Sequence, residues 1–125
     1  MNIALWILAG AMTLAFLAAG FMKAFRPIAE VKKMPWAQPM SDAQIRAIGA
    51  AEILGALGLV IPQATGISTW LTPLAAICLA ILMAGAAATH VRLKDPRSAA
   101  VTTRVLMAVL IVIAAGRILG LLGLF

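Results

Sequence analysis

Two residues of opposite charge, Glu52 and Arg117, stand within long apolar stretches of this chain. An ionisable group at bilayer depth costs about 2.5–3.5 kcal/mol on insertion scales and is usually retained for function or for a specific internal partner. Each of the two shares a helical face with small residues: Gly49, Gly55 and Ala56 around Glu52, and Ala114 and Gly120 around Arg117. Because small residues let membrane helices approach closely, we expect both charges to point toward neighbouring helices.

The depths of Glu52 and Arg117 suggest that they meet. Counted at about 1.5 Å per residue from helix ends near Pro62 and Phe125, both lie about 12–15 Å deep. That depth is close to the midplane of a bilayer whose apolar core is about 30 Å thick. We therefore predict an intramembrane ion pair, which either only fixes the helix register or serves as a ligand contact or proton-exchanging site.

His90 and Lys23 form a second group, near the ends of two other apolar stretches. Each follows small residues three and four positions earlier, so the two faces could meet beside the axis of a helical bundle. Histidine exchanges protons near physiological pH, and with Glu52 it could form part of a proton path. The structural alternative is an interfacial histidine and a lysine that extends its ammonium group toward the headgroups.

The chain has one histidine and one cysteine, Cys78. These two side chains cannot make a tetrahedral zinc site in one chain, and a single cysteine leaves no pair for thiol-disulfide chemistry. We predict no metal centre and no cofactor held by the chain itself, and we interpret Cys78 as a core or lipid-facing residue.

The composition points to lipid as the solvent that surrounds these residues. The chain has 125 residues, of which 64% are hydrophobic and 11% are charged, against about 45–50% and about 25% in soluble domains. A helical span needs about 20 apolar residues, and four such stretches are present. We predict one all-α domain over residues 1–125, an integral membrane bundle of four transmembrane helices at about 3–23, 42–61, 70–91 and 99–125.

Local signals set these boundaries. Pro27 ends the first helix, Ser41–Gln44 has the form of a capping box for the second, and Pro62 is expected to close it. Thr72-Pro73 can open the third helix. Ile28, Val31 and Met34 recur at a spacing of three, which predicts either a short helix on the membrane surface or an irregular loop.

The distribution of charge predicts the orientation. The net charge of +6 comes from basic residues in or beside the first and third loops, whereas the second loop, Pro62–Thr69, has no charged side chain. This is the positive-inside pattern, and it predicts both termini outside the cytoplasm. The basic loops are therefore topology signals and a surface for anionic lipids, and we expect no nucleic-acid binding.

Several segments together resemble the DoxX-like family of small four-helix membrane proteins. The matching segments are Gly20–Lys23 followed by Pro27, Gly49–Pro62, Thr72–Ala76, Gly85–Arg92 and Gly116-Arg117. The resemblance implies a multi-pass protein of the bacterial cytoplasmic (inner) membrane. It also implies a link to thiosulfate and quinone redox chemistry, or a role as the membrane partner of a soluble redox protein.

We therefore expect a redox-associated subunit that binds a quinone or another lipid-soluble molecule in the bundle. Its ligand-binding residues would be Glu52, Arg117, His90 and Lys23, and a soluble redox partner would dock at the basic cytoplasmic loops. The alternatives are a proton-coupled small-molecule transporter, a membrane-embedded acid-base enzyme acting on a hydrophobic substrate, and a scaffold for a soluble partner. Gly116 and Gly120 could also support a homo-oligomer through close helix contact.

Overall fold

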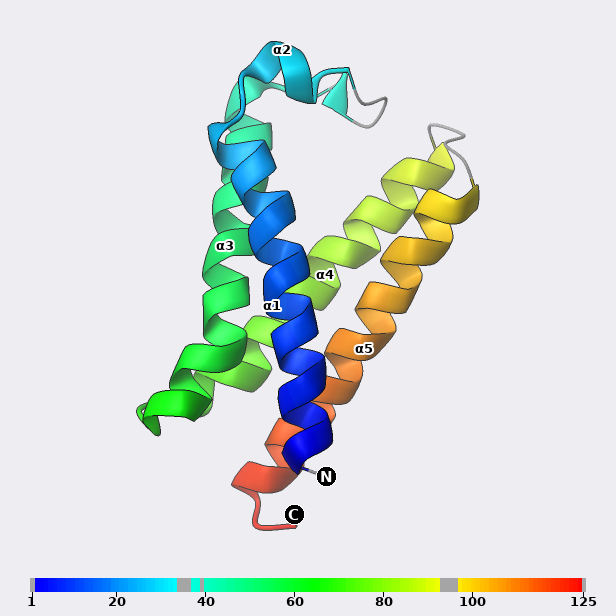
Figure 1. Ribbon diagram of the computed structural model, residues 1–125. Coiled ribbons are helices and arrows are strands. Elements are labelled where there is room, and N and C mark those ends of the chain that lie inside the picture. Colours follow the sequence, from blue (N-terminus) through cyan, green and yellow to red (C-terminus); the bar gives the residue numbers. More distant parts are fainter. Residues whose placement is uncertain (1, 34–36, 39, 93–96, 125) are drawn as a thin grey trace.

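The computed structural model describes residues 2–33, 37–38, 40–92 and 97–124. Within them the chain is all-helical, with the elements α1 (Asn2–Phe25), α2 (Ile28–Val31), α3 (Asp42–Thr65), α4 (Leu71–Arg92) and α5 (Arg97–Leu121) (Figure 1). Each of the four long helices is long and apolar enough to cross a membrane. Only 28–39% of the most apolar window of each span is buried inside the protein, so most of its apolar surface faces outward, as lipid requires.

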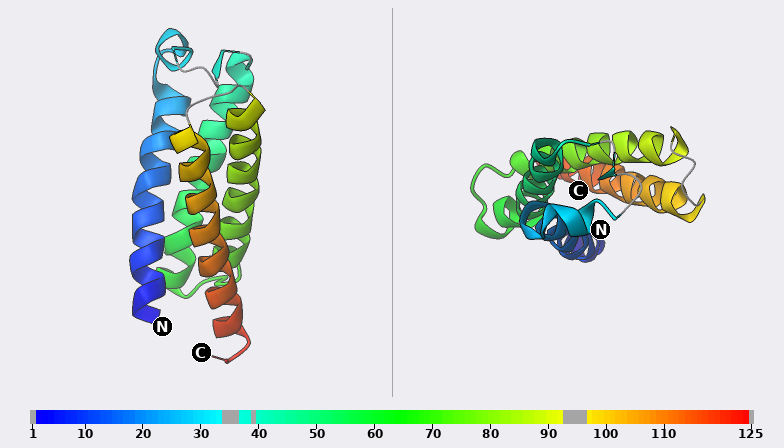
Figure 2. Two further views of the ribbon diagram at one scale, coloured as in Figure 1. Left: turned by 90° about the vertical axis from the view of Figure 1, so that its right-hand side faces the viewer. Right: turned by 90° about the horizontal axis from the view of Figure 1, so that it is seen from above.

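The four long helices are arranged as two antiparallel pairs. α1 packs along α3, α4 packs along α5, and the pairs are joined mainly through contacts between α3 and α4. Figure 1 shows that the pairs converge near the chain termini and diverge toward α2, and the N- and C-termini lie at the same end in Figures 1 and 2. The predicted four-helix fold is confirmed, whereas the side of the membrane on which the termini lie stays a prediction.

The shared core lies where the two pairs converge. Side chains of all four long helices contribute to it: Ala9, Phe16, Ala56, Leu59, Ala76, Leu79, Ala80, Met83, Leu110, Ile113 and Ala114. Glycines bring the helices close at three of these contacts, because a Cβ atom would collide with Leu79 if added at Gly55, with Ala75 at Gly58 and with Leu5 at Gly116. Close contact between the two helix pairs is therefore concentrated in the half of the molecule that carries the termini.

The predicted capping box at the start of α3 is confirmed. The Ser41 hydroxyl accepts from the Gln44 backbone N–H, and the Gln44 side chain accepts from the Ser41 backbone N–H. The predicted end of this helix at Pro62 is wrong, because α3 continues to Thr65 and ends at Gly66 with φ 71°. Pro62 has no N–H for the carbonyl of Gly58, and the buried Thr72 hydroxyl of α4 donates to that carbonyl at 3.0 Å instead.

The end of α5 also differs from the prediction. The helix ends at Leu121 and does not continue to Phe125. Gly123 has φ 75°, and the N–H of Leu124 donates to the carbonyl of Leu119 at 2.9 Å. The N–H of Gly123 donates to Gly120 at 3.1 Å, which completes a Schellman motif. Glycine at this position takes the left-handed conformation without steric cost and so ends the helix.

Of the two alternatives predicted for the first loop, a short helix or an irregular loop, the structure has the short helix, α2. Its Val31 side chain is buried against Ala37 and Ile45, and Ile28 packs beside them. These contacts fasten α2 to the first turn of α3. Met34, the third residue of the predicted pattern, lies outside the described residues.

Candidate ligand site between the helix pairs

Glu52 of α3 forms an ion pair with Lys23 of α1. The Lys23 Nζ atom lies 2.6 Å from Glu52 Oε1, and the side chains are 14% and 1% exposed, respectively. The predicted pairing of Glu52 with Arg117 is therefore wrong. Lys23 does not extend its ammonium group toward the headgroups, but turns it into the protein to meet a carboxylate.

The ion pair forms beside the point where α1 and α3 cross, at Gly20 and Gly49. A Cβ atom on Gly20 would lie 2.8 Å from the carbonyl oxygen of Gly49, and a Cβ atom on Gly49 would lie 2.6 Å from the backbone nitrogen of Ala24. No larger residue fits there without moving the helices apart. Because Lys23 and Glu52 each follow one of these glycines by three residues, their side chains leave the crossing on the same faces.

A hydrogen bond beside the crossing adds to the contact between α1 and α3. The Arg46 guanidinium donates to the carbonyl oxygen of Lys23 at 3.0 Å. This carbonyl lies in the last turn of α1, where carbonyls have no partner within the helix. The end of α1 is thus held to α3 by a backbone contact, an ion pair and a side-chain hydrogen bond.

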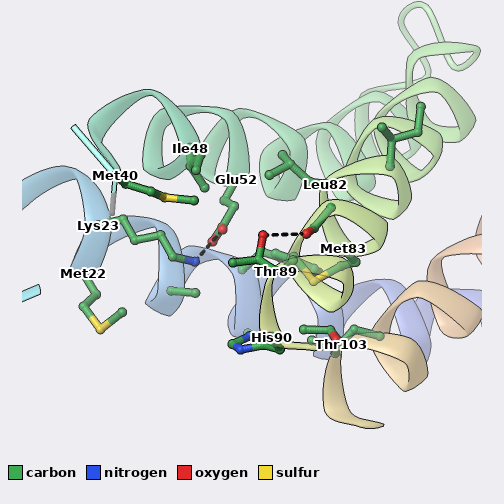
Figure 3. A pocket seen from close by; sticks show the side chains of 17 residues that line it. Met22, Lys23, Met40, Ile48, Glu52, Leu82, Met83, Thr89, His90 and Thr103 are labelled. Atoms are coloured by element: carbon green, nitrogen blue, oxygen red, sulfur yellow. Dashed lines mark hydrogen bonds and ion pairs between the residues drawn. The ribbon is translucent and has the colours of Figure 1, made fainter. Parts of the chain in front are cut away.

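The ion pair borders a cavity of about 440 Å³ in the half of the molecule that carries α2. All four long helices line it, and Figure 3 shows Lys23 and Glu52 meeting on one side while Thr89 and His90 approach from α4. The lining is mostly apolar or small: Ala15, Phe16, Ala19, Met22, Met40, Ile48, Ile81, Leu82, Met83, Gly85, Ala86 and Leu106. The polar side chains among the described lining residues are those of Lys23, Glu52, Thr89, His90 and Thr103.

The polar groups of the cavity differ in what they can offer a ligand. The Thr89 hydroxyl donates to the carbonyl of Gly85 in its own helix at 2.9 Å. Glu52 uses Oε1 for Lys23, whereas its buried Oε2 atom has no hydrogen-bond partner among the described residues. The carboxylate therefore has an acceptor position that no described side chain or backbone group fills.

Arg117 lies outside this cavity, near the end of the molecule that carries the termini. Its guanidinium carbon lies 5.2 Å from the centre of the Trp6 ring, and the side chain is 6% exposed. The predicted equal depth of Glu52 and Arg117 is wrong, because the two depths were counted from Pro62 and Phe125 and the helices end elsewhere. From the observed ends at Thr65 and Leu121, Glu52 is about 20 Å along its helix and Arg117 about 6 Å.

The structure thus brings three of the four predicted ligand-binding residues to one cavity, Lys23, Glu52 and His90, and places Arg117 elsewhere. The sequence analysis missed Thr89 and Thr103 as lining residues and Lys23 as the partner of Glu52. The equal spacing of Gly20 to Lys23 and of Gly49 to Glu52 was a signal that could have identified the pair. Within the described residues, no three side chains of His, Cys, Asp or Glu gather to hold a metal ion.

Comparison with known protein families gives a match that covers most of the chain. A family model described as the DoxX-like family matches residues 7–114. No curated protein and no solved structure shows a significant match. The matched segment contains every residue that lines the cavity and ends before Arg117.

Proposed function

The chain belongs to the DoxX-like family, and from the cavity between its helix pairs we propose that it is a membrane subunit that binds a lipid-soluble molecule of the quinone type. The observation that carries the proposal is an apolar cavity with a buried ion pair on its wall. Ligand sites have volumes of about 300–1,000 Å³, mostly apolar walls and a few polar groups that fix orientation. The cavity of about 440 Å³ has these properties.

The polar groups suit the chemistry of a quinone ring. Its carbonyl oxygens accept hydrogen bonds, and both an ammonium group and an imidazole can donate them. Lys23 and His90 provide these groups from α1 and α4 (Figure 3). The apolar side chains between them would surround the ring and the start of its tail.

Reduction of a quinone to a quinol takes up two electrons and two protons. In this proposal His90 passes protons to the ring oxygens, because histidine exchanges protons near physiological pH. The electrons come from a soluble redox protein that docks at the end carrying α2, where exposed basic residues such as Arg26, Lys33 and Arg92 gather. In this proposal both termini lie outside the cytoplasm, so the end that carries α2 faces the cytoplasm.

The test is equilibrium binding of a short-tailed benzoquinone to the purified protein in nanodiscs, corrected for partition into empty nanodiscs. The informative variant is Gly85→Leu, because Gly85 lines the cavity and an added Cβ would meet nothing within 4 Å. The larger side chain would then project into the ligand space. We expect saturable binding by the parent protein and at least tenfold weaker binding by the variant.

Gly120→Leu is the matched control. Gly120 is also an exposed helical glycine with open space around it, but it does not line the cavity. We expect this variant to bind as the parent protein does. Binding that is not saturable in the parent, or that is equally weakened by both variants, would overturn the proposed site.

A further inference from the structure

We propose that Glu52 Oε2 accepts a hydrogen bond from a hydroxyl or N–H group of the bound molecule, so that the cavity selects lipid-soluble ligands that carry a donor. This inference rests on the proposed function, since it names the kind of ligand that the same cavity holds. It comes from one atom, the buried Oε2 of a residue that lines the cavity, which has no hydrogen-bond partner among the described residues.

The two oxygens of the Glu52 carboxylate have different surroundings. Oε1 accepts from the Lys23 ammonium group at 2.6 Å. Oε2 is an acceptor of the same carboxylate, and an ionised carboxylate has no proton to donate. Leaving a buried acceptor without a donor is unfavourable, and more so when the group is charged. A ligand that supplies the donor therefore recovers free energy that a ligand without one does not.

The neighbouring side chains leave this donor to the ligand. Ala19 on α1 and Leu82 and Ala86 on α4 line the cavity but have no polar side-chain atom. The Thr89 hydroxyl on α4 is used by the carbonyl of Gly85. A donor group of a ligand in the space between α1, α3 and α4 would thus find Glu52 Oε2 without a competing donor among the described residues.

This acceptor distinguishes the two oxidation states of a quinone. The oxidised ring has only carbonyl oxygens, which accept hydrogen bonds and would be repelled by a carboxylate oxygen. The reduced ring has two hydroxyl groups, each with a proton to donate. The geometry therefore favours the quinol, and more generally a phenol with an apolar tail, over molecules that only accept.

The experiment compares a long-chain 4-alkylphenol with its O-methyl ether, which has the same tail and ring but no donor. Both are titrated into the protein in nanodiscs, with partition into empty nanodiscs subtracted. We expect the parent protein to bind the phenol at least tenfold more tightly than the ether. In Glu52→Gln the side chain has both a donor and an acceptor, so we expect this preference to fall below threefold.

Glu30→Gln is the matched control, because it makes the same chemical change at an exposed position on α2. It should retain the full preference. Equal binding of phenol and ether by the parent protein would overturn the inference while leaving the proposed function in place, provided that Gly85→Leu weakens both. A preference that persists undiminished in Glu52→Gln would also overturn it, and no saturable binding of either compound would overturn both proposals. The comparison in the parent protein decides the question even if Glu52→Gln does not insert.

Discussion

The Lys23–Glu52 ion pair is the residue-scale feature on which the site depends. Moving charges out of water is costly, and an intact buried pair adds little to stability compared with apolar residues of similar size. Removing only one partner is different, because it leaves an isolated charge in an apolar setting. The pair is therefore better understood as an arrangement that positions a carboxyl group beside the cavity than as a source of stability.

Lys23→Met tests this view of the pair. We expect it to lower the free energy of unfolding by about 3–5 kcal/mol, because Glu52 loses the one ion-pair partner that it has among the described residues. The double variant Lys23→Met/Glu52→Leu should recover most of that loss, since no charge is then left behind. Unfolding of the purified protein in mixed micelles, followed by far-UV circular dichroism, measures both.

Lys33→Met is the control for a lysine that pairs on the surface. Lys33 lies 3.2 Å from Glu30, and both side chains are exposed. Exposed pairs contribute about 0–1 kcal/mol, so its effect should fall in that range. If Lys23→Met were equally mild, the ion pair would not be the constraint described above.

At the scale of elements, the crossing of α1 and α3 at Gly20 and Gly49 determines where the pair forms. A methyl group on Gly49 would meet the backbone nitrogen of Ala24 at 2.6 Å and the carbonyl of Gly20 at 2.8 Å. Backbone atoms of a helix cannot turn aside as a side chain can. The two helices would have to separate, and their separation would lengthen the contact between Lys23 and Glu52.

Gly49→Ala should therefore destabilise the protein by about 1–3 kcal/mol, as other overpacking substitutions do. Gly10→Ala is the control, since an added Cβ on Gly10 in α1 meets nothing within 4 Å. It should be neutral or stabilising by up to about 1 kcal/mol, because alanine favours the helix more than glycine does. The same unfolding assay checks both, and equal effects would mean that the crossing is not close in the folded protein.

The positions of the long helices could be predicted from the sequence, but some of their ends could not. The capping box at Ser41 is local, because its two hydrogen bonds join residues three positions apart. The continuation of α3 past Pro62 depends on Thr72, which lies on the next helix and donates to the carbonyl of Gly58. Sequence signals near Pro62 do not predict this contact between two helices.

The error in the helix ends then changed the predicted site. Depths counted from Pro62 and Phe125 brought Glu52 and Arg117 to one level, whereas the observed ends separate them. Glu52, Arg117, His90 and Lys23 were predicted as ligand-binding residues because each lies on a face with small residues, and the structure brings all of them except Arg117 to one cavity. The cavity itself depends on the angle between two helix pairs, which no spacing within one helix specifies.

At the scale of the whole molecule, charge is divided between the two ends. The charged side chains of the end that carries α2 include Arg26, Glu30, Lys32, Lys33, Asp42, Arg46 and Arg92. The described part of the opposite end has Arg117, which stacks on Trp6. The pattern predicts that the end with α2 faces the cytoplasm.

Cysteine labelling in intact spheroplasts checks this orientation. In a Cys78→Ala background, Ile67→Cys in the exposed loop between α3 and α4 should react with a membrane-impermeant maleimide. Lys33→Cys, which is exposed at the other end, should react only after the membrane is permeabilised. The reverse pattern would place the cavity in the outer half of the bilayer and would rule out a cytoplasmic redox partner.

The pairing of α1 with α3 and of α4 with α5 also bears on how the chain is made. Lys23 and Glu52 are 29 residues apart in the sequence, so the ammonium group of the first span leaves the ribosome well before the carboxylate that neutralises it. Each helix pair is a hairpin of consecutive spans, and the first hairpin carries both charges. The first hairpin would thus complete its ion pair only once α3 has been made and packs against α1.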